Sequence, residues 1–482
     1  MSRTVEPFAP ADGQTVRLYT CGPTVYNPAH IGNFRTFLFE DLLRRALKLQ
    51  GWKVEQVMNL TDVEDKIIAK AHRTGTTIDA VTAPAIERFF ADRDYLKIEP
   101  AEHYPRATEY IPGMIDLVQR LESKGLAYRA DDGSVYFAIR KLPTYGRLSR
   151  LDTRTIKAGA RVAQDDYSKD DANDFALWKA AKPEDEAAGA AWDSPWGRGR
   201  PGWHLECSVM AMAILGETLD MHCGGIDLIF PHHEDEIAQS EGATGVTFAR
   251  HWCHGEFLLT DGAKMAKRVG NVITVADLRE HDVSAAAVRH LMYNTHYRQV
   301  LNLSDAGLEA SRGAVANLAE LADRLDAPLT VGGTAAMAES RRELEMQVRA
   351  ALSDDLNSPR ALAAVFEFVR AANADLDRKG TDRSAIDEAR RALEFVDSVL
   401  GIVPPARLGG LIGSRGRVSL TRAPVGEVES ALVGVVEGRL AERAKAREMR
   451  DFALSDAIRD ELLASGVAIA DSAVGTTWKR VK

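Results

Sequence analysis

The sequence predicts an α/β fold in which a parallel-sheet domain carries an insertion and is followed by a helical region and a small C-terminal α/β unit. Over about the first hundred residues, strand-like and helix-like runs alternate, which is typical of a parallel sheet with right-handed crossovers. A Trp-, Gly- and Pro-rich stretch at 192–197 belongs to a segment that interrupts this pattern before it resumes. Beyond Val275 the chain is mostly helical, with many Ala, Leu, Glu and Arg residues.

The first elements follow from the spacing of apolar residues. A short strand is expected at 16–21 and the next one at 53–58. Between them, apolar residues recur at helical spacing from Phe34 to Leu47, and Gly51 is suited to end that helix. These elements form the first strand–helix–strand unit of the predicted sheet.

The middle of the chain reads as an insertion at 106–201. It contains an expected helix at 111–126 and a strand at 134–137, followed by many charged residues. The sheet pattern resumes at Gly202 and continues through 228–230 to about Gly255.

The C-terminal part has a different composition. Residues 401–424 are rich in Pro and Gly with few bulky side chains, which indicates a linker. After it come a helical stretch at 428–464 and an expected short hairpin at 467–478.

Length and charge limit the classes of protein. A chain of 482 residues suggests roughly two to four domains. The net charge is -9, so nucleic-acid binding would need a local basic surface. The N-terminal residues lack a signal-peptide pattern and no apolar run is long enough for a bilayer, so we expect a cytoplasmic protein with no membrane partner.

The four cysteines are too sparse for a disulfide scaffold, which leaves metal ligation, catalysis or burial as their roles. They are Cys21, Cys207, Cys223 and Cys253.

A first candidate site is the segment His30-Ile31-Gly32-Asn33, which opens the first predicted helix. A helix N-terminus favours phosphate, and Gly32 permits close approach of a ligand to the backbone. His30 can donate to phosphate oxygens. The alternative is a structural role, because a His before a Gly often only begins a helix.

A second candidate is the basic segment at 261–271, which contains Lys264, Lys267 and Arg268 between glycines. Such cations can stabilise charge on transferring phosphoryl groups. The alternative is a solvated basic turn.

Together these two segments resemble the HIGH and KMSKS motifs of class I aminoacyl-tRNA synthetases. Asn33 stands in place of the last His, and Ala266 and Arg268 replace the two serines in KMAKR. Asn33 can still donate through its amide. The resemblance implies an ATP site, with Mg²⁺ accompanying ATP, at His30, Gly32, Asn33, Lys264 and Lys267.

A candidate metal site combines distant segments. In the run 230–236, His232 and Glu236 are four residues apart and share one face of an expected helix that begins at Pro231. With Cys21 and Cys207 they would make a tetrahedral zinc set. Ligand chemistry leaves the register open, because His233 is also available, and a solvated helix face is the alternative.

Segments 20–26, 202–207 and 225–234 look like the zinc-site segments of cysteinyl-tRNA synthetases. This resemblance implies zinc ligation by Cys21, Cys207, His232 and Glu236, and structural roles for Cys223 and Cys253.

Segments 59–66, 174–179, 355–359, 451–460 and 475–478 are similar to further segments of that family, so the resemblance covers nearly the whole chain. It implies a Rossmann-like catalytic domain, a helical bundle and an anticodon-binding unit. The implied divisions are 1–105 (first half of the catalytic domain), 106–201 (connective insertion), 202–255 (second half with the zinc site), 256–300 (KMSKS-loop and stem-contact region), 301–400 (bundle), 401–424 (linker) and 425–482 (anticodon-binding unit).

The resemblance also implies a reaction: ATP-dependent activation of L-cysteine and transfer to tRNA(Cys), with zinc distinguishing the thiol from the hydroxyl of serine. Trp203 and His204 are candidate walls of the amino-acid pocket, and Asp227 is a candidate for the substrate ammonium. Core packing is the alternative for Trp203. A monomer is expected.

The C-terminal unit carries basic residues near an aromatic one, a combination that suits single-stranded bases. The alternative is a solvated helix face balanced by neighbouring acids. The residues are Arg439, Arg443, Lys445, Arg447, Arg450, Trp478 and Lys479.

Two rival functions remain from the sequence. A cysteine ligase acting on an amino sugar would lack the C-terminal unit, and a non-catalytic tRNA-binding paralogue is supported only by the altered KMAKR segment. A metallopeptidase would need HExxH, which the sequence does not contain.

Overall fold

The computed structural model describes residues 4–150, 174–260, 262–265, 272–326, 336–378 and 383–404, together with six pairs of helical residues between 439 and 462 and the segments 467–472 and 475–480. By its internal contacts the chain divides into a unit Met1–Leu420 and a unit Thr421–Lys482.

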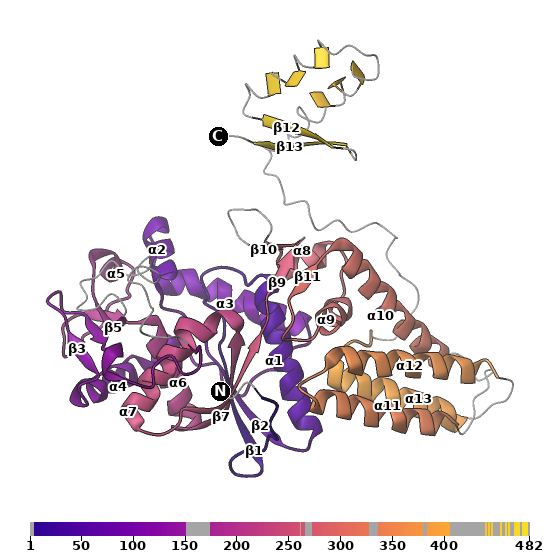
Figure 1. The fold of residues 1–482 in the computed structure, drawn as a ribbon, viewed down its shortest axis with the longest axis horizontal. Helices are drawn as coiled ribbons and strands as arrows, with labels where there is room; N and C mark the ends of the chain where they lie inside the picture. The colour runs from indigo at the N-terminus through magenta and orange to yellow at the C-terminus, as the bar shows by residue number, and fades with distance from the viewer. Residues whose placement is uncertain are drawn as a thin grey trace. The chain divides into compact units, whose positions relative to one another are not determined.

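The first unit is built around a four-stranded parallel sheet, which confirms the predicted fold class (Figure 1). The strand order is β2-β1-β7-β8. Helix α1 follows β1 and helix α7 follows β7, as expected for parallel strands that need crossover connections. The bounds are β1 Thr15–Thr20, α1 Ile31–Leu49, β2 Lys53–Met58, β7 Leu219–Gly225, α7 Glu234–Thr244 and β8 Ala249–Gly255.

This strand order creates a switch point between β1 and β7. From β1 the chain continues to β2 on one side, and from β7 it continues to β8 on the other. Open parallel sheets bind ligands outside the carboxyl ends of the strands at such a point. Cys21 directly follows β1 and Gly225 ends β7, so both lie at this edge.

Helix α1 matches the predicted helix and buries the predicted stripe. Phe34 and Leu38 are fully buried, and Leu42 is nearly so. The residues after the helix turn the chain back toward β2, and Gly51 has a φ of 91°, a conformation that glycine adopts without steric cost. Helices α2 (Asp65–Thr74) and α3 (Ile78–Tyr95) follow β2.

The insertion contains its own antiparallel sheet in the order β3-β4-β5-β6. The predicted helix and strand are both present, the helix ending three residues earlier than expected. The elements are α4 Ile111–Ser123, β3 Ala127–Arg129, β4 Val135–Phe137, β5 Phe175–Ala180, α5 Pro183–Ala187 and β6 Gly199–Pro201.

Two details after Gly202 differ from the sequence prediction. The chain first forms helix α6 (Trp203–Leu215) and then β7. Residues 228–230 lie in short helical turns, Ile226–Leu228 and Ile229–His233, rather than in a strand, and α7 begins at Glu234 rather than at Pro231. A run of three apolar residues has no periodicity that separates a strand from a helical turn.

A small second sheet, in the order β10-β9-β11, joins the main sheet to the helical part. Its strands have two or three residues, too short to be recognised from periodicity. Helices α8 and α9 lie between β10 and β11 along the chain. The bounds are β9 Leu258–Thr260, β10 Ala263–Lys264, α8 Val275–Glu280, α9 Ala285–Tyr293 and β11 Leu301–Leu303.

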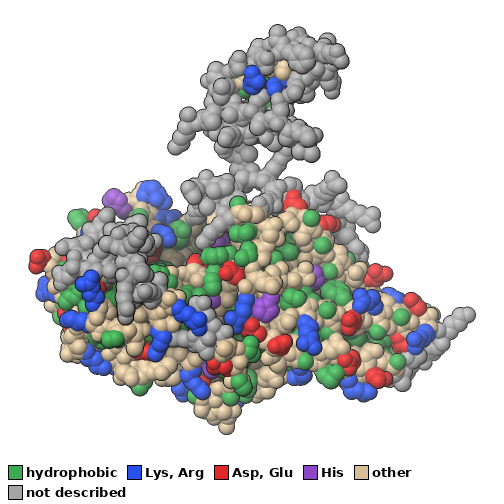
Figure 2. Space-filling view, in the orientation of Figure 1, with side chains coloured by type: hydrophobic (Ala, Val, Ile, Leu, Met, Phe, Trp, Pro, Cys, Tyr) green, Lys and Arg blue, Asp and Glu red, His purple; other side chains and the backbone are tan. Residues whose placement is uncertain are grey.

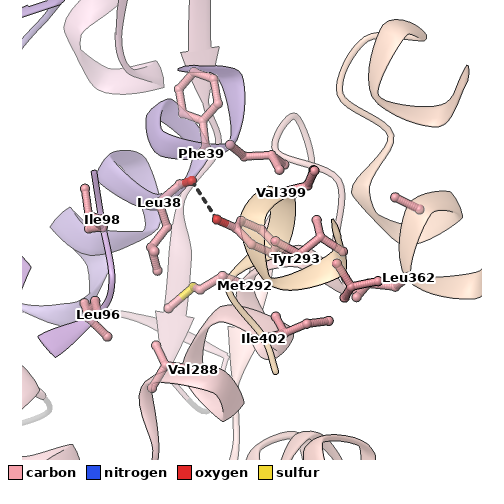
Figure 3. Packing of buried hydrophobic residues seen from close by; sticks show 14 of the residues in the cluster. Leu38, Phe39, Leu96, Ile98, Val288, Met292, Tyr293, Leu362, Val399 and Ile402 are labelled. Carbon is pink, nitrogen blue, oxygen red and sulfur yellow. Dashed lines mark hydrogen bonds between the residues drawn. The ribbon is translucent and has the colours of Figure 1, made fainter. Parts of the chain in front are cut away.

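Four longer helices complete the first unit, and α13 packs against α1 (Figure 1). A continuous apolar core joins the sheet, α9 and these helices. Figure 3 shows part of it, including the Tyr293 hydroxyl, which donates to the Leu38 carbonyl at 3.2 Å. The helices are α10 Asp305–Asp326, α11 Ala336–Ser353, α12 Ser358–Leu376 and α13 Arg383–Leu400.

The second unit contains the predicted hairpin, formed by antiparallel strands β12 (Val467–Ser472) and β13 (Gly475–Arg480). Most of the predicted linker, 405–424, lies outside the described residues. Among the described residues, no helix combines the length and the apolar character needed to cross a membrane.

Candidate active site and metal centre

His30 and Asn33 cap the N-terminus of α1 reciprocally. The His30 Nδ1 accepts from the Asn33 backbone N at 3.2 Å, and the Asn33 Oδ1 accepts from the His30 backbone N at 3.1 Å. Because Nδ1 is an acceptor, a neutral His30 carries its proton on Nε2. The same bonds leave the Asn33 amide nitrogen as a donor at the exposed start of the helix.

The structure brings the two motif segments together. His30 forms a β-bridge with Thr274, and the Ile31 backbone N donates to the Ile273 carbonyl at 2.8 Å. A Cβ at Gly32 would lie 3.1 Å from Met265 Cε, so the glycine leaves room for the methionine of the second motif. Segments about 240 residues apart therefore meet at the N-terminus of α1, as an ATP site built from both requires.

The two predicted lysines differ in what the structure describes. Lys264 lies in β10, where its backbone pairs with Leu259 of β9. Lys267 lies outside the described residues, as do Ala266 and Arg268. Their phosphate contacts stay predictions.

The four predicted zinc ligands lie together in a fully buried cluster. One ligand atom from each of Cys21, Cys207, His232 and Glu236 lies within 4.8 Å of the others. The His232 Nε2 is 3.0 Å from the Glu236 Oε1, which fits their spacing of four residues. Cys21 directly follows β1 and Cys207 lies in α6. His232 lies in the turn Ile229–His233, and Glu236 lies in the first turn of α7.

A second, overlapping group meets the same distance criterion. It shares Cys21 and Glu236 but is completed by His222 and His233. The His233 Nε2 is 3.4 Å from the Cys21 Sγ, and the His222 Nε2 is 2.8 Å from the Glu236 Oε2. The choice of His232 over His233 therefore stays a prediction.

The protonation of the cluster fits a site for a cation. Burial raises the pKa of the Cys21 thiol well above its usual value. The hydrogen bond with Cys21 lowers the pKa of Cys207, but burial and the Glu236 carboxylate outweigh it and the net shift is upward. Burial lowers the pKa of His232 to about 3, which keeps the imidazole neutral and able to ligate. A divalent cation would favour both thiolates, and two thiolates, an imidazole and a carboxylate suit zinc.

Two of the three predicted pocket residues contact His232. The Trp203 ring stacks on it with centroids 4.4 Å apart, and the His204 Nδ1 is 2.8 Å from the His232 Nδ1. Asp227 is exposed in the turn after β7, and a Cβ at Gly225 would lie 2.5 Å from its Oδ1, so the glycine allows the carboxylate to fold over the strand end. The structure thus brings Trp203 and His204 to the metal cluster and places Asp227 at the same sheet edge.

Sequence reasoning missed a loop of the insertion that docks on the start of α7. The Glu234 carboxylate accepts from the backbone N of Gly146 and of Ser149, each at 2.8 Å. The Tyr145 hydroxyl donates to Asp235. In the sequence, Glu234 and Asp235 are simply part of the run 230–236, and no periodicity in the insertion indicates that it reaches them.

The structure also adds His222 and His254 to the site. His222 lies on β7 and His254 on β8, and the His254 Nε2 is 2.8 Å from the His233 Nδ1. A usable signal was present for His254, because it lies one residue before the carboxyl end of β8, where open parallel sheets bind ligands. His222 lies in the middle of β7 and had no such signal.

Charges of both signs are interspersed over the described residues on the face seen in Figure 2. In the second unit, Arg443 is only 4% exposed and its Nε donates to the Ser455 carbonyl, and Arg439 pairs with Glu442 and Glu461. Arg443 is therefore buried rather than on a solvated face, whereas the contacts of Arg439 fit the balanced helix face. Arg447 and Arg450 lie outside the described residues.

Family models match most of the first unit. A model described as the tRNA synthetases class I (C) catalytic domain matches residues 7–313, and a DALR domain model matches residues 347–404. The finer domain boundaries expected from the sequence stay predictions.

Two curated proteins are similar over nearly their whole length. A cysteine–tRNA ligase of Solibacter usitatus is 44% identical over 484 residues, which cover 100% of this chain and 98% of that protein. A cysteine–tRNA ligase of Chlamydia pneumoniae is 42% identical over 467 residues, which cover 96% and 94%.

Solved structures share the fold at low identity. The methionyl-tRNA synthetase of Mycobacterium tuberculosis in complex with methionyl-adenylate matches with a TM-score of 0.58 and 16% identity, covering 80% of this chain and 92% of that one. This likeness bears on the fold alone.

Proposed function

The chain belongs to the cysteine–tRNA ligases, a class I aminoacyl-tRNA synthetase family, and we propose that it activates L-cysteine with ATP and transfers the cysteinyl group to tRNA(Cys). The observation that carries the proposal is that a buried group of possible metal ligands, including two thiols, and the two segments that resemble the class I motifs lie at one sheet edge.

We assign zinc binding to Cys21, Cys207, His232 and Glu236, whose ligand atoms cluster within 4.8 Å. When bound, zinc supplies a soft Lewis acid that prefers a thiolate to the hydroxyl of serine. Trp203 then forms a wall beside His232, and His204 hydrogen-bonds the outer nitrogen of that ring, which fixes its orientation.

Asp227 is assigned to the ammonium group of cysteine. Its carboxylate is exposed at the end of β7, on the same edge as Cys21, so it can pair with a cation entering that edge. This places the amino group and the thiol of the substrate at two separate anchors, which holds the carboxylate toward the nucleotide.

The ATP phosphates are assigned to His30, Asn33, Lys264 and Lys267, with Gly32 allowing close approach. In the cap at the start of α1, His30 accepts through Nδ1 and Asn33 through Oδ1, so each side chain would meet phosphate through its other, donating nitrogen. Magnesium accompanies ATP. Catalysis is positioning and charge stabilisation, without a covalent enzyme intermediate.

Two transfers make up the reaction. In the first, the cysteine carboxylate attacks the α-phosphorus of ATP and pyrophosphate leaves. In the second, a hydroxyl of the terminal tRNA ribose attacks the cysteinyl carbonyl and AMP leaves. We assign anticodon contact to residues 425–482 and infer that the protein acts as a monomer.

The activation step predicts cysteine-dependent exchange of pyrophosphate into ATP. We expect exchange with cysteine and none above background with serine, because the hard hydroxyl is a poor partner for the metal cluster. The measurement is isotope exchange on zinc-loaded protein. Absence of exchange from folded, zinc-loaded protein would contradict the proposed activity and favour a non-catalytic paralogue, and exchange without charging of tRNA(Cys) would favour another acceptor.

Lys267→Ala is expected to lower kcat for this exchange by about 100-fold, because it removes a cation from the developing pyrophosphate. The measurement is the same exchange at saturating ATP and cysteine. Lys53→Ala is the control, since Lys53 is exposed at the amino end of β2, the edge of the sheet away from the site. Equal activity of the two variants would remove Lys267 from the assignment.

A further inference from the structure

The loop between α11 and α12 has an unusual backbone conformation. Asp355 and Leu356 both have positive φ, 53° and 55°, although neither is glycine. Leucine rarely adopts this region, and such residues persist where surrounding contacts over-determine them. Leu356 is buried in the apolar core, which supplies part of that constraint.

Asp355 supplies the rest of the constraint on this loop by contacting three consecutive residues that follow α9. Its carboxylate accepts from the Tyr297 hydroxyl at 2.7 Å, and from Arg298 through Nε at 2.7 Å and Nη2 at 2.9 Å. Its backbone carbonyl is 2.8 Å from the His296 Nε2. A bidentate pair with a planar guanidinium fixes orientation as well as distance.

The same turn is held by helix α1. The Arg35 Nη2 donates to the carbonyls of Thr295 and His296, each at 3.0 Å. The Tyr297 ring stacks on Phe39 with centroids 4.7 Å apart, and Figure 3 shows Phe39 next to Leu38. The turn 295–298 is therefore fixed between α1, which carries the first phosphate motif, and Asp355 of the helical bundle.

The turn 295–298 also supports the strands that lead to the second motif. The Glu256 backbone N donates to the Tyr297 carbonyl at 2.7 Å, directly before β9. Strand β9 pairs with β10, in which Lys264 lies opposite Leu259. Hydrogen bonds thus join Asp355 to Tyr297 and Tyr297 to Glu256, and the chain continues from Glu256 into β9, whose Leu259 pairs with Lys264.

We propose that Asp355 is a positioning residue for adenylate formation: it fixes the turn 295–298, and through it strands β9 and β10, so that Lys264 lies at the nucleotide site. The inference rests on the proposed function, because it takes Lys264 as a phosphate ligand. Asp355 itself touches no substrate.

The exposure of the Asp355–Arg298 ion pair indicates that it fixes the geometry of the turn more than it stabilises the folded protein. The Arg298 side chain is 56% exposed and that of Asp355 is 27% exposed, a setting in which an ion pair adds little to folding. Burial alone would lower the pKa of Arg298, but its hydrogen bonds to Asp355 outweigh this and raise it. A displacement of about 1 Å far from the reacting atoms can cost ~100-fold in rate.

The test is Asp355→Asn in the full-length, zinc-loaded protein. Asparagine tolerates positive φ as aspartate does, so the loop conformation is kept while the bidentate acceptor for Arg298 is lost. We expect kcat for cysteine-dependent pyrophosphate exchange to fall by about 10- to 100-fold, with the KM for cysteine changing less than about twofold.

The matched control is Asp377→Asn, which removes the exposed partner of Arg324 (Nη2 to Oδ1, 2.6 Å) in the same bundle. It should leave kcat unchanged. Arg298→Gln should reproduce the loss, and the double variant with Asp355→Asn should be no worse than either single variant, because both break one contact.

Three results would each overturn the inference. The first is an unchanged kcat in Asp355→Asn, and the second is a change only in the KM for cysteine or in zinc content. The third is that the losses of the two single variants add in the double variant. Failure of the proposed function is a different result, since the unmodified protein would then show no cysteine-dependent exchange at all.

Discussion

Cys207→Ser is expected to remove the bound zinc and to lower kcat/KM for cysteine-dependent pyrophosphate exchange by more than about 100-fold. Changes to groups that only support zinc ligands already cost about 10- to 100-fold, so loss of a ligand costs more. Serine preserves the shape of the side chain but offers a hydroxyl, a poor ligand for zinc beside the buried thiol of Cys21. The measurements are zinc content by elemental analysis and exchange kinetics with added zinc.

Cys253→Ser is the matched control for this change. Cys253 lies on β8 and belongs to neither of the two groups of metal-ligating residues among the described residues. It should keep one zinc per chain and unchanged selectivity for cysteine over serine. If Cys207→Ser retained zinc and activity, the assignment would pass to the overlapping group of Cys21, Glu236, His222 and His233.

The long elements of the fold could be predicted from the sequence because each has a clear period. Helix α1 was expected from residues that the structure buries, such as Phe34 and Leu38, and β2 was expected at the bounds it has. The sheet β10-β9-β11 and the turns at 226–233 could not be, because segments of two to five residues carry no period. The conformation of the turn 295–298 could not be predicted either, because contacts with distant residues fix it.

The candidate site could also be predicted only in part. Residue types and a resemblance were enough to choose Cys21, Cys207, His232 and Glu236, which the fold gathers at one point. They were not enough to exclude His233, because adjacent histidines at a helix start both reach the cluster. The choice depends on how the outer nitrogens are held, by His204 for His232 and by His254 for His233, and those partners come from other elements.

Arg289→Met is expected to lower the free energy of unfolding of the first unit by about 3–5 kcal/mol, the usual cost of breaking a buried ion pair on one side. Arg289 and Asp41 are both fully buried, with Nη2 and Oδ2 2.6 Å apart. Burial alone would lower the pKa of Arg289, but Tyr293 and Asp41 outweigh it and raise the pKa, so the guanidinium is charged.

Arg289 also serves as a hydrogen-bond donor to three backbone carbonyls. Its Nε donates to Leu400 at 2.7 Å, and its Nη1 to Leu96 at 3.0 Å and to Lys97 at 3.1 Å. Methionine fills a similar volume but donates nothing, so these carbonyls and the Asp41 carboxylate lose partners in the core. One side chain thus joins α1, α9, the end of α3 and the end of α13.

The measurement is the urea concentration at which half of the first unit is unfolded, monitored by circular dichroism in zinc-loaded protein. Arg390→Met is the control. Arg390 pairs with Asp326 at 3.1 Å, where both side chains are about half exposed, so its loss should change stability by less than about 1 kcal/mol. Adding Asp41→Asn to Arg289→Met should cost less than the sum of the single changes, because the carboxylate has already lost that cation. Equal midpoints for Arg289→Met and Arg390→Met would show that burial of this pair contributes nothing beyond a surface contact, and that α1 and α13 are held together by their other contacts, such as the Arg45 hydrogen bond to the Ser398 carbonyl.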